Sequence, residues 1–163
     1  MSLLENLMVI PEHQRGESLW GALGFGPTVE AQERDAHEVA SAALEFVELY
    51  HLRNEPARVL SGGQRKLLEL ARALMATPRM ILLDEPGAGV NPALMRRIVT
   101  KIEEMAASGI SFLLIEHDMD LVMGLCNPIL VMNEGTLLMS GDSAEVRSDA
   151  RVLEAYLGAQ TPG

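Results

Sequence analysis

The hydrophobic pattern of this chain changes period along its length, which predicts both helices and buried strands. From about Val29 to Leu52, apolar residues recur every three or four positions and charged residues lie mostly between them, as in a long amphipathic helix. The same spacing predicts helices from about Gly63 to Ala76 and from Pro92 to about Ser108. Near the start, Ser2-Leu3-Leu4-Glu5 is a capping box that opens a short helix. Residues 11–28 are rich in Gly, Pro and charge, and we expect an irregular loop there.

Short apolar runs between the helical patterns predict strands. Met80–Asp84 and Ile110–Ile115 have too little polar alternation for a half-exposed strand, so we expect both to be buried on two faces, as in a parallel sheet. Pro128–Met132 and Thr136–Ser140 flank Asn133-Glu134-Gly135, which predicts a hairpin. Short helices are expected at 118–125, 143–147 and 150–157. This order of helices and strands predicts an α/β fold.

Composition narrows the possible partners. The 163 residues carry a formal net charge of −10, which argues against a surface for nucleic acid or anionic lipid. The one cysteine, Cys126, excludes an internal disulfide and fits a reducing compartment. No apolar run reaches the length of a membrane span, and the N-terminus has no basic region before an apolar core. We therefore expect a cytoplasmic domain, compatible with a peripheral subunit on a membrane partner.

Two stretches carry candidate phosphate chemistry. Ser61-Gly62-Gly63-Gln64 opens a helix with a good N-cap and two glycines that let an anion approach free backbone N–H groups. The alternative for these residues is a plain helix cap. Asp84 and Glu85 follow a buried strand at its carboxyl end, where open α/β sheets bind their ligands. A buried Asp84 would need a partner, and the alternative is a salt-bridged pair at a strand end.

These stretches, in this order and spacing, resemble the ATP-binding cassette (ABC) ATPases. Leu60–Gln64 is similar to the signature motif of that family, and Met80–Asp84 to its Walker B strand, followed by the catalytic glutamate at Glu85. Ala88–Asn91 occupies the place of the D-loop, although Asn91 departs from the aspartate common there. Leu114–Asp118 resembles the strand that ends in the switch histidine, which would be His117. The alternative for His117 is an ordinary loop histidine.

The resemblance implies ATP as substrate and Mg²⁺ as its metal. Asp84 would hold the Mg²⁺, Glu85 would polarise the attacking water, and His117 would contact the γ-phosphate. The signature residues Ser61, Gly62, Gly63 and Gln64 would grip a nucleotide bound to an opposing ATPase subunit in a head-to-tail dimer, and Asn91 would belong to the same cofactor-binding set. Integral-membrane permease subunits would be the other partners, with the chain on the inner face of the cell membrane.

One family motif has no counterpart in these 163 residues. The nearest string to G-x-x-x-x-G-K-[ST] is Gly21–Thr28, which has Pro27 where the lysine belongs. The resemblance thus implies an incomplete P-loop NTPase core without its N-terminal part: a helical subdomain at 1–77 and the C-terminal half of the α/β core at 78–163. Because the P-loop strand would separate Ile110–Ile115 from Pro128–Met132, we expect these strands to pair with each other, or the chain to associate with another, or to be marginally stable.

Further residues narrow the resemblance to the ATPase subunits of branched-chain amino-acid importers. They are Glu85–Pro92, Ile115–Met119 and the ending Ala155–Gly158. The resemblance implies a role in importing hydrophobic amino acids, with the isolated chain inactive for want of a P-loop. Alternatives are a lipopolysaccharide-export ATPase, a non-transport ABC ATPase such as one in DNA repair or translation, a non-catalytic interaction module, and a half-site acting in trans.

Overall fold

The computed structural model describes residues 1–10 and 26–158, and the chain forms two compact units. The first unit comprises 1–82 and 86–113, and the second comprises 83–85 and the residues from 114 onward. Each unit has its own core and is described by itself. Most of the expected loop, residues 11–25, lies outside the described residues, whereas 26–28 belong to a helix and not to a loop.

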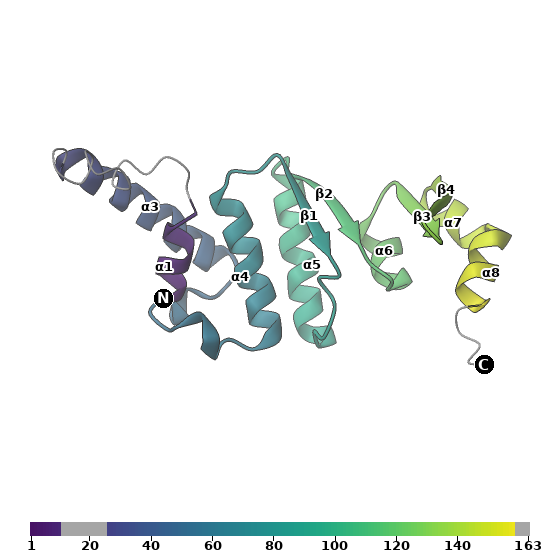
Figure 1. Cartoon of the computed structure of the whole chain (residues 1–163), viewed down its shortest axis with the longest axis horizontal. Helices are drawn as coiled ribbons and strands as arrows, with labels where there is room; N and C mark the ends of the chain where they lie inside the picture. Colours follow the sequence, from purple (N-terminus) through teal and green to yellow (C-terminus); the bar gives the residue numbers. More distant parts are fainter. Residues whose placement is uncertain (11–25, 159–163) are drawn as a thin grey trace. The chain divides into compact units, whose positions relative to one another are not determined.

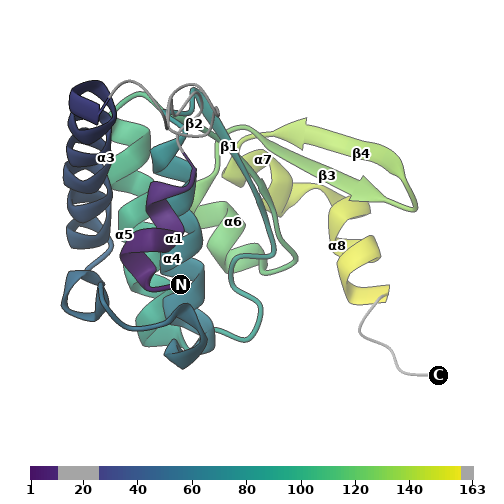
Figure 2. The same cartoon turned by 60° about the vertical axis from the view of Figure 1, so that its left-hand side comes forward.

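The first unit is built on helices. They are α1 (Leu3–Met8), α3 (Gly26–Phe46), α4 (Gly62–Met75) and α5 (Pro92–Ala107). Two 3₁₀ turns, η2 (Tyr50–Leu52) and η3 (Ala57–Val59), connect α3 to α4. Helix α1 packs on both α3 and α4, while α4 also packs on α5 (Figures 1 and 2). Their facing side chains form the core: Leu3, Leu7, Leu44, Leu49, Leu67 and Ile98 are all buried.

Helix α3 ends at Phe46, six residues earlier than the sequence predicted. Glu48 has a left-handed backbone with φ of 61°. The N–H groups of Glu48 and Leu49 donate to the carbonyls of Glu45 and Leu44, which is the hydrogen-bond pattern of a Schellman motif. That position usually holds glycine, so a glutamate there is not a stop signal in the sequence. The packing of Leu49 into the core explains the end of the helix.

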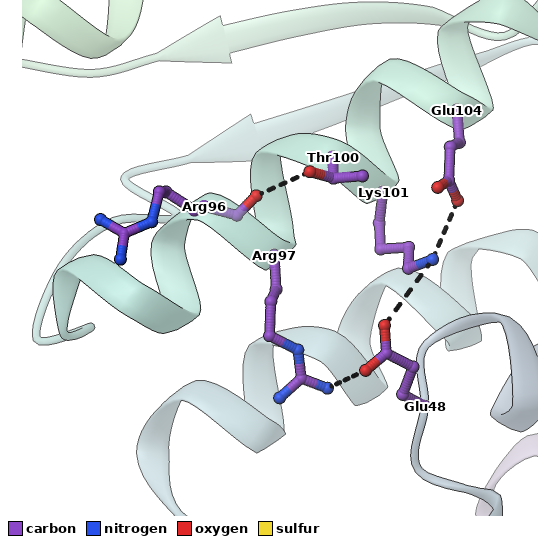
Figure 3. Close-up of polar contacts among 6 residues, drawn as sticks. All are labelled: Glu48, Arg96, Arg97, Thr100, Lys101 and Glu104. Carbon is purple, nitrogen blue, oxygen red and sulfur yellow. Dashed lines mark hydrogen bonds and ion pairs between the residues drawn. The ribbon is translucent and has the colours of Figure 1, made fainter.

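Ion pairs connect the end of α3 to α5 (Figure 3). Glu48 accepts from Arg97 Nη2 at 2.7 Å, and its other oxygen lies 3.9 Å from Lys101 Nζ. Lys101 also pairs with Glu104 at 2.9 Å and lies over the ring of Phe46, 4.8 Å from its centroid. This cluster fixes the left-handed residue of the turn against the neighbouring helix.

Strands β1 (Met80–Asp84) and β2 (Ser111–Ile115) form a two-stranded sheet. The N–H of Ser111 donates to the carbonyl of Arg79, and the N–H of Glu85 donates to that of Ile115. The residue numbers increase in the same direction along both strands from one hydrogen bond to the other, so the strands are parallel. The expectation that both strands are buried on two faces is wrong, because Met80 and Leu82 are exposed while Ile81 between them is buried.

The second unit contains α6 (Met119–Leu125), a hairpin of β3 (Ile129–Asn133) and β4 (Thr136–Gly141), and helices α7 (Ser143–Ser148) and α8 (Ala150–Gly158). The hairpin is antiparallel, with a register shift between Val131 and Met132. Glu134 and Gly135 form its turn, both with positive φ, as a type I′ turn requires. Ile129, Val146 and Val152 form the core, and Cys126 packs against it.

The strands at the expected gap do not pair with each other. Among the described residues, β2 belongs to the sheet with β1, and β3 belongs to a separate sheet with β4. Of the three alternatives, pairing of Ile110–Ile115 with Pro128–Met132 is therefore wrong, whereas association with another chain and marginal stability stay predictions. The hairpin with β4 pairs one edge of β3 with a neighbour that is adjacent in the sequence, so that edge does not need β2 as a partner.

Candidate functional site

The N-terminus of α4 carries the predicted anion site. Ser61 is the N-cap, and its hydroxyl accepts the N–H of Gln64 at 3.3 Å. The Gln64 side chain returns to accept the N–H of Ser61 at 2.9 Å, which completes a capping box. Both side chains therefore cap the helix in this structure, which is what the alternative of a plain helix cap predicts. The N–H groups of Gly62 and Gly63 point out of the first turn, where a helix has no internal acceptor for them.

The two glycines of this turn have opposite surroundings. A Cβ added to Gly62 would meet no atom within 4 Å, so this position is open to a ligand. Gly63 is buried, and a Cβ there would collide with the side chain of Leu94. From the sequence, both glycines were predicted to let a ligand approach the backbone. The structure shows that Gly63 is also required for packing against α5.

Asn91 is the N-cap of α5. Its side-chain oxygen accepts the N–H of Leu94 at 3.0 Å, and Pro92 follows at the first helical position. Because Leu94 also packs on Gly63, the start of the predicted D-loop helix contacts the start of the predicted signature helix. These residues all belong to the first unit.

The candidate catalytic residues lie in the second unit. Asp84 ends β1 and is exposed, so the expected cost of burying its carboxylate does not arise. Glu85 has a φ of 44°, and its backbone N–H extends the pairing with β2 by donating to Ile115 at 2.9 Å. This left-handed residue turns the chain away from the strand, and leaves the Glu85 side chain about half exposed.

His117 follows β2 and contacts Glu85. Its Nδ1 lies 3.4 Å from Glu85 Oε1, and the pairing of β1 with β2 brings these two residues together. The His117 side chain is 77% exposed, so the imidazole is accessible to a ligand. The structure therefore brings together the two residues predicted to be catalytic.

Glu116 is a neighbour of this pair that sequence reasoning did not select. Its side chain is only 2% exposed, and its Oε2 accepts the backbone N–H of His117 at 3.2 Å. The same oxygen lies 3.9 Å from His117 Nδ1. The sequence does contain a signal for this role, because Glu116 is a charged residue that directly follows an apolar strand and directly precedes His117. Glu116 thus contributes to the position of His117 from the buried side.

The metal predicted for Asp84 requires few protein ligands. Within the described part of the chain, no group of three or more His, Cys, Asp or Glu residues could hold a metal ion. Mg²⁺ at phosphate sites usually keeps several waters and takes one or two carboxylates together with phosphate oxygens. A single exposed carboxylate at a strand end fits that type of site. Over the residues described, no helix is long and apolar enough to cross a membrane.

Comparison with known proteins identifies the class of protein. The family model described as ABC transporter matches residues 3–88, which is more than half of the chain. The chain belongs to the ABC transporter family. A second model, described as branched-chain amino acid ATP-binding cassette transporter, matches residues 136–161. The resemblance drawn from the motifs is confirmed.

Similar curated proteins are named as amino-acid transport subunits. The chain is 39% identical over 160 residues to the probable branched-chain amino acid transport ATP-binding protein LivG of Archaeoglobus fulgidus, covering 98% of the chain and 61% of the relative. It is 42% identical over 162 residues to the protein of the same name in Methanocaldococcus jannaschii, covering 97% and 62%. It is 36% identical over 159 residues to the Escherichia coli LivG, with the same coverage. The chain thus spans about three fifths of the length of these relatives.

Solved structures confirm the predicted α/β class and its relation to P-loop NTPases. A structure of MJ1267, an ATP-binding cassette of an ABC transporter, matches with a TM-score of 0.77 at 41% identity, covering 96% of this chain and 62% of that one. Its ADP conformation matches with a TM-score of 0.74 at 38% identity, covering 97% and 63%.

Proposed function

We propose that this chain is part of an ATPase subunit that couples ATP hydrolysis to the import of branched-chain amino acids. The observation that carries the substrate class is the match of residues 136–161 to the branched-chain amino acid transporter model. The names of the similar curated proteins support the same assignment. We further propose that 1–77 acts as the helical subdomain and 78–163 as the C-terminal half of the ATPase core.

The proposed catalytic residues are Glu85 and His117. MgATP, when bound, supplies the γ-phosphate that is hydrolysed. Glu85 then polarises the attacking water, Asp84 holds the metal, and His117 contacts the γ-phosphate. The 3.4 Å contact between His117 Nδ1 and Glu85 Oε1 supports this pairing. Because the two side chains touch, a movement of His117 on contact with the γ-phosphate would also change the position of Glu85.

The proposed role of Ser61, Gly62, Gly63 and Gln64 is to bind a nucleotide held by an opposing ATPase subunit. Support comes from the open space at Gly62 and from the free N–H groups at the start of a 14-residue helix. Asn91, as the N-cap of α5, fixes the segment that would communicate with that subunit. The proposed assembly is a head-to-tail ATPase dimer on integral-membrane permease subunits, at the inner face of the membrane.

A chimera tests the transport assignment. The part of Escherichia coli LivG that lies outside the match is joined to this chain and expressed in cells that lack LivG, and uptake of labelled leucine is measured. Restored uptake that Glu85→Gln lowers by about 10²-fold or more would support the proposal, because general bases contribute that much to rate. A chimera that hydrolyses ATP and binds the permeases but restores no leucine uptake would contradict the substrate class.

The signature role has its own control. Gly62→Val places a branched side chain over the free N–H groups, while Gly124→Val makes the same change at another exposed helical glycine with open space around it. In the chimera, only Gly62→Val should abolish ATP hydrolysis. Equal effects of both variants would contradict the proposed role of the α4 N-terminus.

A further inference from the structure

Glu116 is a buried charged residue beside the two proposed catalytic residues. It directly follows β2, and its side chain is only 2% exposed. Burial of a carboxylate is costly unless donors surround it, and Glu116 Oε2 accepts the backbone N–H of His117 at 3.2 Å. A neutral oxygen would satisfy that N–H without the cost of burying a charge. The burial of a carboxylate at this position therefore indicates a role for its charge.

The carboxylate of Glu116 lies near the imidazole of His117. Glu116 Oε2 is 3.9 Å from His117 Nδ1, and Glu85 Oε1 is 3.4 Å from the same nitrogen. The two glutamates follow neighbouring strands, and the N–H of Glu85 donates to the carbonyl of Ile115 at 2.9 Å. The pairing of β1 with β2 thus places two carboxylates near one nitrogen of the ring, and all three side chains belong to the second unit.

Two carboxylates near Nδ1 favour one of the two neutral forms of the ring. An ionised carboxylate only accepts hydrogen bonds, whereas one nitrogen of a neutral imidazole carries a proton and the other does not. A bare Nδ1 would place its lone pair near two negative oxygens, and a protonated Nδ1 places positive charge there instead. Both distances exceed those of a good N–H···O hydrogen bond, so the preference is mainly electrostatic. The geometry therefore favours the proton on Nδ1 and leaves Nε2 bare.

We propose that Glu116 is a positioning residue that keeps the proton of His117 on Nδ1 and so reserves Nε2 for a phosphate oxygen. A phosphate oxygen accepts hydrogen bonds, so Nε2 takes up a proton from water when the phosphate binds. The ring is then positively charged, and the carboxylates of Glu85 and Glu116 stabilise that charge. This inference rests on the proposed contact of His117 with the γ-phosphate. A purely structural role of Glu116, limited to its bond with the N–H of His117, would not select a ring nitrogen.

NMR measures which ring nitrogen of His117 carries the proton. In the full 163-residue chain with isotope-labelled histidine, two-bond proton–nitrogen spectra distinguish a protonated ring nitrogen from a bare one. The signals of His117 are assigned by their loss in His117→Gln, and spectra are compared at a pH at which the ring is neutral. We expect the proton mainly on Nδ1. The exposed His37 of α3 is an internal reference, which should show the usual preference of a solvated imidazole for Nε2–H.

A matched pair of variants separates the charge of Glu116 from its shape. Glu116→Gln keeps an oxygen that can accept the N–H of His117 and removes the charge. Glu154→Gln removes the same charge from an exposed position of α8 in the same unit. Glu116→Gln should lower the ratio of Nδ1–H to Nε2–H roughly threefold or more, as expected for the loss of one charge near the ring. Glu154→Gln should leave that ratio unchanged.

Two results of these spectra would overturn the proposal. The first is a proton mainly on Nε2 of His117 in the unchanged chain, which is decisive even if Glu116→Gln does not fold. The second is an unchanged ratio of Nδ1–H to Nε2–H in Glu116→Gln when its circular dichroism matches that of the unchanged chain. In that case Glu116 would serve only as an acceptor for the backbone.

A nucleotide analogue distinguishes this proposal from the proposed function. In the chimera, a non-hydrolysable ATP analogue with Mg²⁺ should move the Nε2 signal of His117 to the protonated position and leave Nδ1 protonated. A change at Nδ1 in place of Nε2 would overturn the proposal. No change at either nitrogen with the nucleotide bound would contradict the phosphate contact of His117, which belongs to the proposed function. The spectra of the 163-residue chain need no nucleotide, so they decide the position of the proton separately.

Discussion

The side chain of Leu94 occupies the space in which a Cβ on Gly63 would stand. Gly63 lies in the first turn of α4 and Leu94 in the first turn of α5, and the N-cap Asn91 accepts the N–H of that same leucine. The beginnings of the two helices are therefore packed together through one side chain. A substitution of either residue should therefore alter the packing at the N-terminus of α4, the predicted anion site, and also at the start of α5.

The first prediction concerns the two glycines of α4. Gly63→Ala should lower the free energy of unfolding by about 1–3 kcal/mol relative to Gly62→Ala, because the new methyl group overpacks the contact with Leu94. Gly62→Ala should be neutral or slightly stabilising, since alanine is the better helix former and its Cβ meets open space. Urea unfolding of both variants measures the difference. The double variant Gly63→Ala, Leu94→Ala should recover part of the loss, and no recovery would contradict the packing explanation.

The second prediction concerns the N-cap of α5. Asn91→Ala should destabilise the chain by about 1 kcal/mol, because the N–H of Leu94 loses its acceptor. Asn91→Asp keeps an acceptor for that N–H. Its free energy of unfolding should therefore stay within a few tenths of a kcal/mol of that of the unchanged chain. Thermal unfolding of the two variants compares them. A larger loss in Asn91→Asp than in Asn91→Ala would show that capping is not what Asn91 contributes.

The third prediction separates backbone strain from ion pairing at Glu48. Both Glu48→Ala and Glu48→Gly remove the pairs with Arg97 and Lys101, but only glycine adopts a φ of 61° without steric cost. Glu48→Gly should therefore unfold with a free energy about 1 kcal/mol above that of Glu48→Ala in urea titrations.

The dependence of stability on salt concentration measures what the ion pairs of Glu48 contribute. The ion pairs are exposed and should contribute less than about 1 kcal/mol, decreasing as salt is added. Arg97→Gln should show the same salt dependence as Glu48→Gly, without any relief at the backbone. A difference between Glu48→Gly and Glu48→Ala that vanished in high salt would assign the effect to charge and not to φ.

The fourth prediction concerns pH and helix α8. Arg151 donates hydrogen bonds to the carboxylate of Asp149, which lowers the pKa of Asp149 from 3.8 to about 2. A depressed pKa in the folded state gives stability that is present above the unfolded pKa of about 4 and is lost as pH falls toward 2. Carbon NMR titration should place the pKa well below 3.8. Arg151→Gln should return it toward 3.8, and Arg147→Gln, which removes the same charge from α7, should not.

The fifth prediction concerns nucleotide binding by the 163 residues alone. Calorimetry with MgATP should detect no binding, because the sequence has no P-loop string to surround the phosphates. Glu85→Gln, which would slow release in a hydrolysing site, should change nothing. Mg²⁺-dependent binding that the Glu85→Gln variant prolongs would show that the chain forms a phosphate site from other residues.

Local chemistry in the sequence was sufficient for most elements. Ser2 and Glu5, Ser61 and Gln64, and Asp118 all cap helices where their side chains predict a start, because a cap needs only neighbours three residues away. The hairpin turn at Glu134 and Gly135 was predictable for the same reason. The end of α3 was not, since it depends on burial of Leu49 by other helices.

The sequence by itself was sufficient to predict the family and the order of most elements, and it proposed the residues of the candidate site, because motifs and caps are encoded over short spans. Only the tertiary structure decided that His117 reaches Glu85, that Gly63 is filled by Leu94, and that β1 and β2 are covered on one side. An apolar run indicates that a strand prefers burial on both faces, whereas burial itself requires a partner from elsewhere. Met80, Leu82 and Leu113 are therefore exposed, although the apolar runs that contain them predicted burial.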